Sequence, residues 1–118
     1  MSGADIRRAA ADLLTLTLDS RRTLDDAMMT SQVFNALEGS DRGFARAIAS
    51  SALRHLGWID TALAPLLSRP LPAVTAPIRA LLRTGVTQLW LMDTPPHAAV
   101  GETVEAAKGW PEARSGGA

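Results

Sequence analysis

The sequence predicts an all-α protein. Leu and Ala dominate its 118 residues, Tyr is absent and Phe occurs twice. No stretch alternates Val, Ile and Thr as a strand would, whereas apolar residues recur at intervals of three and four. A chain of this length makes one domain. We therefore expect a single bundle of about six helices.

The first expected helix covers residues 4 to about 19. Its apolar residues fall on one face, and Arg7 and Arg8 lie outside that face. A second, short helix begins after Thr23, whose hydroxyl is a suitable N-cap, and ends near Leu37. Acidic residues follow the cap, where the helix dipole favours negative charge.

The third and fourth helices are separated by Gly57, which we expect to stop the third helix. Ser40 or Asp41 caps the third helix, and the segment "WIDTALAPLL" forms the fourth. Arg54 and Asp60 flank the glycine and are expected to form an ion pair. The proline-rich segment "SRPLPAVTAP" that follows is predicted to be a connection.

The fifth expected helix spans Val74 to Met92. Pro77 lies in its first turn, where a missing N–H has no cost. A broad apolar arc covers much of its circumference. Arg79, Arg83 and Trp90 lie opposite this arc.

Two prolines separate the fifth helix from the sixth. Asp93 or Thr94 is expected to cap the sixth helix, and Pro95 and Pro96 fix a stiff corner between antiparallel helices. His97 follows in the first turn as an isolated histidine. We assign it a structural role at the corner.

The sixth helix carries a glycine and is followed by a polar tail. Gly101 costs around 1 kcal/mol relative to Ala within a helix, which predicts close packing there. Residues 111–118 lack apolar periodicity, so we expect a disordered tail or a truncated linker after a domain of residues 1–110. Three residues are expected to face inward from the helix: Val100, Val104 and Ala107.

Positive charge is concentrated in the middle of the sequence. The formal net charge is zero, but residues 47–92 hold four arginines and a single acid, Asp60. Eleven of the twelve basic residues are arginine, whose guanidinium suits bidentate phosphate contacts. The overall charge gives no argument for a polyanion partner, and a high arginine content can also reflect coding bias.

Several classes of function are disfavoured by the residues. The sequence has no cysteine, which rules out disulfides, thiolate metal ligands and a cysteine nucleophile. The N-terminus "MSGADIRRAAADLL" does not read as a secretory signal, and no apolar run approaches the roughly 20 residues of a membrane span. We expect a soluble, cytoplasmic protein without membrane contact.

Three segments together resemble the NusB-like RNA-binding family: "RRAAADLLTLTL", "DRGFARAIASSALRHLGWIDTAL" and "IRALLRTGVTQLWLMDTPPHAAVGETVEAAK". The likeness covers residues 5–108, and "LLRTGVTQL" followed by "PPHAAVGETVEAAK" is its most specific part. Within this family the double-proline corner is most similar to the N-terminal domains of the RsmB-type ribosomal RNA cytosine-5 methyltransferases. The resemblance implies a NusB-like helical bundle.

The resemblance also implies parts that this chain lacks. In the family a last helix follows "AAK", and in the methyltransferases a catalytic domain comes after it. The sequence ends about where that helix would begin, so we expect a fragment or truncated gene product with an uncovered apolar groove. Without a cysteine or a glycine-rich loop for S-adenosylmethionine, the chain is expected to be no enzyme and to need no cofactor.

The candidate RNA-binding residues are Arg7, Arg8, Arg79, Arg83 and Trp90. The first two resemble in position the basic start of the first NusB helix. Arg79 and Arg83 lie one turn apart with Trp90 in the same sector, which suits phosphate contact and base stacking on single-stranded RNA. The structural alternatives are a solvated helix end, an internal salt bridge and a packed indole.

Three functions fit these observations. The leading hypothesis is an RNA-binding module that helps a ribosomal RNA methyltransferase recognise its substrate, with the catalytic domain in cis. The second is a protein-interaction module, including a homodimer. The third is a stand-alone transcription antitermination factor of NusB type, which the double-proline corner disfavours.

Overall fold

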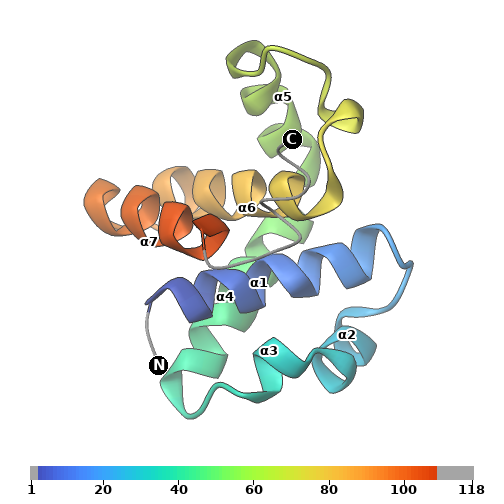
Figure 1. The fold of residues 1–118 in the computed structure, drawn as a ribbon, viewed down its shortest axis with the longest axis vertical. Helices are drawn as coiled ribbons and strands as arrows, with labels where there is room; N and C mark the ends of the chain where they lie inside the picture. Colours follow the sequence, from blue (N-terminus) through green and yellow to red (C-terminus); the bar gives the residue numbers. More distant parts are fainter. Residues whose placement is uncertain (1–2, 109–118) are drawn as a thin grey trace.

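The computed structural model describes residues 3–108, and all of its secondary structure there is helical (Figure 1). The predicted all-α bundle is confirmed. None of the described helices is long and apolar enough to span a bilayer. The α-helices in chain order are α1 (Gly3–Leu18), α2 (Leu24–Thr30), α3 (Gln32–Asn35), α4 (Ser40–Arg54), α5 (Leu56–Leu63), α6 (Ala76–Val86) and α7 (Pro96–Lys108).

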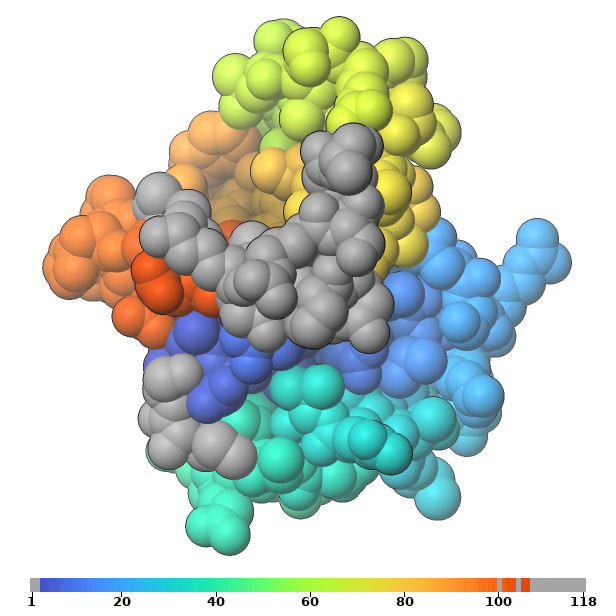
Figure 2. Space-filling view, in the orientation of Figure 1, coloured from blue at the N-terminus to red at the C-terminus, as the bar shows by residue number. Residues whose placement is uncertain are grey.

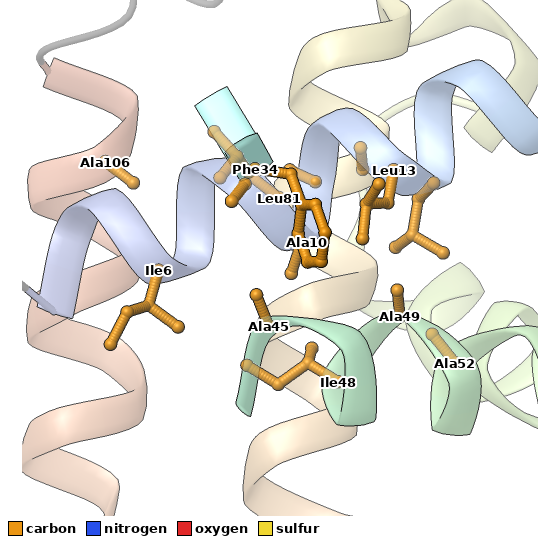
Figure 3. Packing of buried hydrophobic residues seen from close by; sticks show 14 of the residues in the cluster. Ile6, Ala10, Leu13, Phe34, Ala45, Ile48, Ala49, Ala52, Leu81 and Ala106 are labelled. Carbon is orange, nitrogen blue, oxygen red and sulfur yellow. The ribbon is translucent and has the colours of Figure 1, made fainter. Parts of the chain in front are cut away.

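Helix α1 is the centre of the bundle. Helices α3, α4, α6 and α7 all pack against it. Because neighbours lie on several sides, α1 buries more than one apolar stripe, and its alanines let the neighbouring backbones come close. Figure 3 shows this contact from nearby, with Ala10 and Leu13 of α1 beside Ala45 and Ala49 of α4, all of them fully buried.

The second predicted helix is broken in two at Ser31. This residue ends α2 and caps α3, where its hydroxyl accepts a hydrogen bond from the N–H of Phe34 at 3.1 Å. The same hydroxyl donates to Asp12 on α1 at 2.6 Å. The N-cap at Thr23 is confirmed, since its side chain accepts from the N–H of Asp26.

The start and end of α4 differ from the prediction. Gly39, with a φ of 55°, precedes the helix, and neither Ser40 nor Asp41 caps it through its side chain. The break before α5 falls at His55. Gly57 lies inside α5, so its predicted role as the stop is wrong.

The proline-rich connection is confirmed. It contains two short 3₁₀ turns, η1 (Ala64–Leu66) and η2 (Leu71–Ala73), and leads into α6 with Pro77 in the first turn. Figure 2 shows the segment of residues 56–75 as a lobe at the upper end of the molecule.

The fifth predicted helix is α-helical only to Val86. It continues as a π-helical turn, η3 (Thr87–Leu91). Side chains compete for its backbone carbonyls, because Thr84 donates to the carbonyl of Ala80 and Gln88 donates to that of Thr84. Such back-bonding loosens a helix, and the wider turn is the result.

The double-proline corner is confirmed as a stiff bend. The N–H of Thr94 donates to the carbonyl of Gln88 at 3.0 Å, and the carbonyl of Pro95 accepts from Ala98 at 2.9 Å as α7 begins. His97 is exposed, and its ring bonds to no described residue.

Gly101 of α7 differs from the prediction. Gly101 is exposed, and a Cβ there would meet no atom within 4 Å, so the predicted close packing is wrong. The side chains of Val100, Val104 and Ala107, and the whole tail of residues 111–118, lie outside the described part of the structure.

Candidate functional site

The guanidinium of Arg7 lies inside the bundle. Its Nε donates to Oε1 of Gln88 at 2.7 Å, and its carbon atom lies 5.1 Å from the centre of the Phe44 ring. Burial lowers the pKa of Arg7, and the negative charge of Glu102 opposes this effect. The expected surface position of Arg7 is wrong, because α1 is covered on the side that the sequence pattern assigned to solvent.

Arg8 is held against its own helix. Its Nη1 lies 3.0 Å from Oδ1 of Asp5. Its Nε is buried and has no hydrogen-bond partner. The side chain therefore stays near the surface with one of its donors unused.

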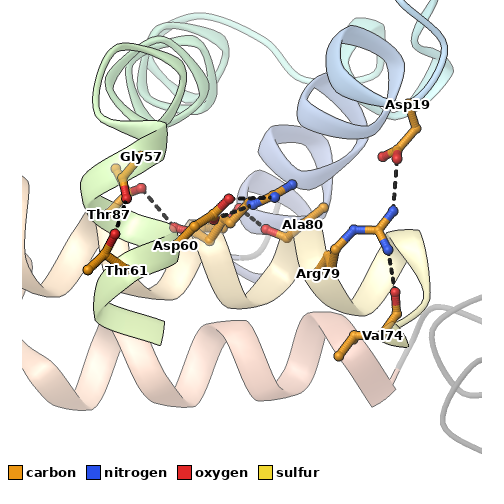
Figure 4. A network of polar contacts seen from close by, with 10 residues as sticks. Asp19, Gly57, Asp60, Thr61, Val74, Arg79, Ala80 and Thr87 are labelled. Carbon is orange, nitrogen blue, oxygen red and sulfur yellow. Dashed lines mark hydrogen bonds and ion pairs between the residues drawn. The ribbon is translucent and has the colours of Figure 1, made fainter. Parts of the chain in front are cut away.

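Arg79 and Arg83 both project from α6 towards carboxylates, and Figure 4 shows Arg79 directed towards Asp19. Arg79 donates to Asp19 at 2.8 Å and also to the carbonyl of Val74, while Arg83 makes a bidentate pair with Asp60, both bonds at 2.9 Å. The expected pair of Arg54 with Asp60 is wrong, because Asp60 faces α6.

The two arginines face a shared hollow at the surface. Its volume is about 560 Å³, and both guanidinium groups and both carboxylates line it together with apolar side chains: Leu18, Asp19, Leu56, Asp60, Leu71, Pro72, Arg79 and Arg83. Each positive charge is matched by a negative one. The hollow therefore has little net charge.

Trp90 is separated from these arginines. Its ring packs edge to face against that of Trp58 on α5, with centroids 5.7 Å apart and planes at 84°. Each indole is 51% exposed. The structure thus brings Arg79 and Arg83 together but joins Trp90 to a tryptophan that the sequence analysis did not select.

A second set of arginines lies at the surface without a carboxylate partner among the described residues. These are the arginines best placed to meet a phosphate, since no ion pair must break first. The sequence analysis did not select these arginines for RNA contact. Two of them, Arg54 and Arg69, lie in residues 47–92, where arginines outnumber acidic residues. The set is Arg21, Arg22, Arg42, Arg46, Arg54 and Arg69.

The described residues show no candidate metal centre. They contain no group of three His, Asp or Glu side chains that could hold a metal ion. His55 is used locally, with its Nδ1 2.9 Å from the carbonyl oxygen of Ser51.

Comparison with known proteins identifies relatives over nearly the whole chain. Ribosomal RNA small subunit methyltransferase B of Xanthomonas campestris pv. campestris is 36% identical over 116 residues, which is 98% of this chain and 26% of the relative. The protein of the same name from Pseudomonas syringae pv. tomato is 35% identical over 101 residues, 86% of this chain and 22% of the relative. The chain spans about a quarter of the length of these relatives.

A solved structure shares the fold. It is titled "Crystal Structure of a Plectonemic RNA Supercoil", and its matched chain is 20% identical with a TM-score of 0.76. The superposition covers 98% of this chain and 87% of the other. The model of the NusB family matches residues 4–117, and the chain therefore belongs to the NusB family.

Proposed function

We propose that this chain is the RNA-binding module of a bacterial ribosomal RNA methyltransferase and that it aids recognition of the substrate RNA in the cytoplasm. The observation that carries the proposal is its 36% identity, over nearly its whole length, with a protein named as a ribosomal RNA methyltransferase. The chain spans about a quarter of that relative, and we propose RNA binding rather than methyl transfer for it.

Affinity for RNA is expected to come from arginine contacts with phosphate. The unpaired surface arginines defined above supply charge without loss of an ion pair. The paired residues Arg8, Arg79 and Arg83 remain predicted contacts, but a phosphate would first have to displace their carboxylates. The buried position of Arg7 argues against direct contact, and its role in the proposal is to hold the bundle together.

The proposal is tested by titrating the chain with a single-stranded fragment of small-subunit ribosomal RNA at two salt concentrations. Neutralising about three phosphates gives a slope of log K against log salt near −2, or roughly 20-fold weaker binding between about 50 and 200 mM salt. Binding that does not respond to salt would contradict phosphate contact. Absence of binding at low salt would contradict the function itself.

A matched pair of variants separates the two sets of arginines. Arg46→Ala removes an unpaired arginine and Arg79→Ala removes a paired one. We expect Arg46→Ala to lower the salt slope by about 0.7, and Arg79→Ala to change it less. A larger decrease in salt slope for Arg79→Ala than for Arg46→Ala would instead support phosphate contact by the arginines predicted from the sequence.

Protein interaction is a second candidate, and one observation favours it. A hollow of about 360 Å³ between α5, α6 and α7 has a wholly apolar lining: Leu63, Leu66, Ile78, Leu81, Leu82, Gly85, Val86, Leu89, Ala99 and Thr103. Leu66 at its edge is 69% exposed. Light scattering at increasing concentration tests self-association through this hollow, and Leu82→Glu should abolish any dimer that forms there. A strict monomer at high concentration would contradict the homodimer.

A further inference from the structure

Two tryptophans form an exposed aromatic pair between α5 and the π-helical turn. Trp58 and Trp90 touch edge to face, and about half of each indole remains in solvent. Large aromatic rings are normally covered when a domain folds, so two half-exposed rings in contact mark a binding surface. The wide turn of η3 carries Trp90, and such turns often occur at functional sites.

The pair offers both ring surface and hydrogen-bond donors. Neither indole N–H bonds to a described residue. With 51% of each residue exposed, part of the aromatic surface of the pair is accessible to a third planar group. A nucleic-acid base satisfies both features, because it stacks through its face and accepts hydrogen bonds at its edge.

An unpaired arginine lies beside the pair along the chain. Arg54 ends α4, and the backbone stays hydrogen-bonded through the break at His55, since the N–H of Ile59 donates to the carbonyl of His55 at 2.9 Å. Arg54 lies four residues before Trp58 in the sequence, on the other side of the break at His55. Arg54 is exposed and has no described ionic partner.

Charge favours a nucleic acid over a protein as the occupant. Asp60 is the only acid among residues 47–92, which carry both tryptophans, and Arg83 holds it. Arg54, close in sequence to Trp58, is thus left without a described ionic partner. That combination is the general requirement for binding a single strand, in which bases stack and phosphates meet cations.

We propose that Trp58 and Trp90 form the base-stacking site for single-stranded RNA, with Arg54 contacting the adjoining phosphate. The inference rests on the proposed RNA-binding function and assigns it to a site. The occupant is one unpaired base and its phosphate. Base identity is read weakly, because every base presents a similar ring face.

The test uses the full chain with Trp110→Phe, so that fluorescence reports only the two tryptophans of the pair. Titration with single-stranded RNA should quench this fluorescence. Trp58→Ala and Trp90→Ala should each weaken binding by about 5- to 100-fold. Trp90→Phe should retain most of the affinity, and Arg54→Ala should lower the salt slope by about 0.7.

Met29→Ala is the matched control, because Met29 is also an exposed apolar residue, at 80%, and lies on α2. It should leave the RNA-induced quenching unchanged, because Met29 lies in a hollow with Arg42 and Arg46 and not at the tryptophan pair. Circular dichroism establishes that each variant is folded. If a truncated tryptophan variant fails to fold, quenching in the parent chain together with Arg54→Ala decides the question.

The outcomes distinguish this inference from the function on which it rests. If the parent chain binds no RNA at low salt, both are overturned. If it binds RNA without quenching, and the tryptophan variants bind equally well, only the stacking site is overturned. The same holds if Trp90→Ala leaves RNA binding intact but abolishes self-association in light scattering, since the pair is then a protein contact.

Discussion

Arg7 is the only arginine in the described part of the chain that is buried. Arginine stays protonated in proteins, so this guanidinium is a buried cation. A buried cation without partners is costly, and here Gln88 supplies the nearest acceptor while the Phe44 ring covers the guanidinium plane. This contact joins α1 to the turn after α6. Arg7 is therefore a structural residue.

The first prediction is that Gln88→Ala destabilises the protein by about 2 kcal/mol. The substitution removes the acceptor at 2.7 Å and leaves the Arg7 Nε–H buried without a partner. Urea unfolding followed by circular dichroism measures the change in the free energy of unfolding. Arg46→Ala, at an exposed position, should change it by less than about 0.5 kcal/mol.

A double variant examines the cause of that loss. Replacing Arg7 and Gln88 together by Met removes both polar groups and keeps apolar side chains of similar length. We expect it to recover much of the stability lost in Gln88→Ala, because no unpaired buried cation remains. A double variant less stable than Gln88→Ala would show that the arginine contributes through its own packing.

For single residues, the sequence predicted which side chains share a helix face better than it predicted which residues contact them. Helical spacing placed Arg79 and Arg83 together, and the structure confirms that they project from one helix towards neighbouring carboxylates. It could not reveal that Asp19 and Asp60 would meet them, since those contacts join residues 60 and 23 positions apart. The contact between Trp58 and Trp90 was hidden for the same reason.

The elements were predictable where local signals were strong. The periodicity of α1, the N-cap of α2 and the proline corner before α7 placed the starts of these helices close to those observed. The errors lie at Ser31, at His55 and in the η3 turn, where side-chain bonds interrupt helices whose residues would otherwise allow continuation. Periodicity does not detect such interruptions, because the apolar face continues across them.

Two neighbouring glycines provide the second prediction. Gly39 has a φ of 55°, which L side chains adopt only with strain, whereas Gly43 lies within α4 with open space where its Cβ would be. Gly39→Ala should lower the free energy of unfolding by about 1 kcal/mol. Gly43→Ala should raise it by about 0.5 to 1 kcal/mol.

Thermal and urea unfolding of both variants measure these changes. Each variant is the control for the other, because both add the same methyl group and differ only in the backbone conformation of the glycine that is replaced. Loss of stability in both variants would mean that α4 cannot accept a larger side chain near its N-terminus. A gain in both would contradict the positive φ at Gly39.

The whole molecule is organised around α1, and its parts are unequally anchored. Five of the other α-helices contact α1, which carries much of the alanine-rich core. Helix α5 instead contacts α4, α6 and the following turn, and the segment of residues 56–75 stands apart at the upper end in Figure 1. Local opening is easiest where few buried contacts must break.

The last prediction is therefore a gradient of amide hydrogen exchange. Amides of α1 around Leu13 should exchange only through global unfolding, while those of α5 should exchange about tenfold faster or more, equivalent to about 1.4 kcal/mol less protection. Native-state exchange followed by NMR at several urea concentrations measures both. If RNA stacks on Trp58, adding RNA should slow exchange in α5, because a ligand stabilises the segment that it binds. Equal protection of α1 and α5 in the free protein would show instead that the lobe unfolds only with the rest of the bundle.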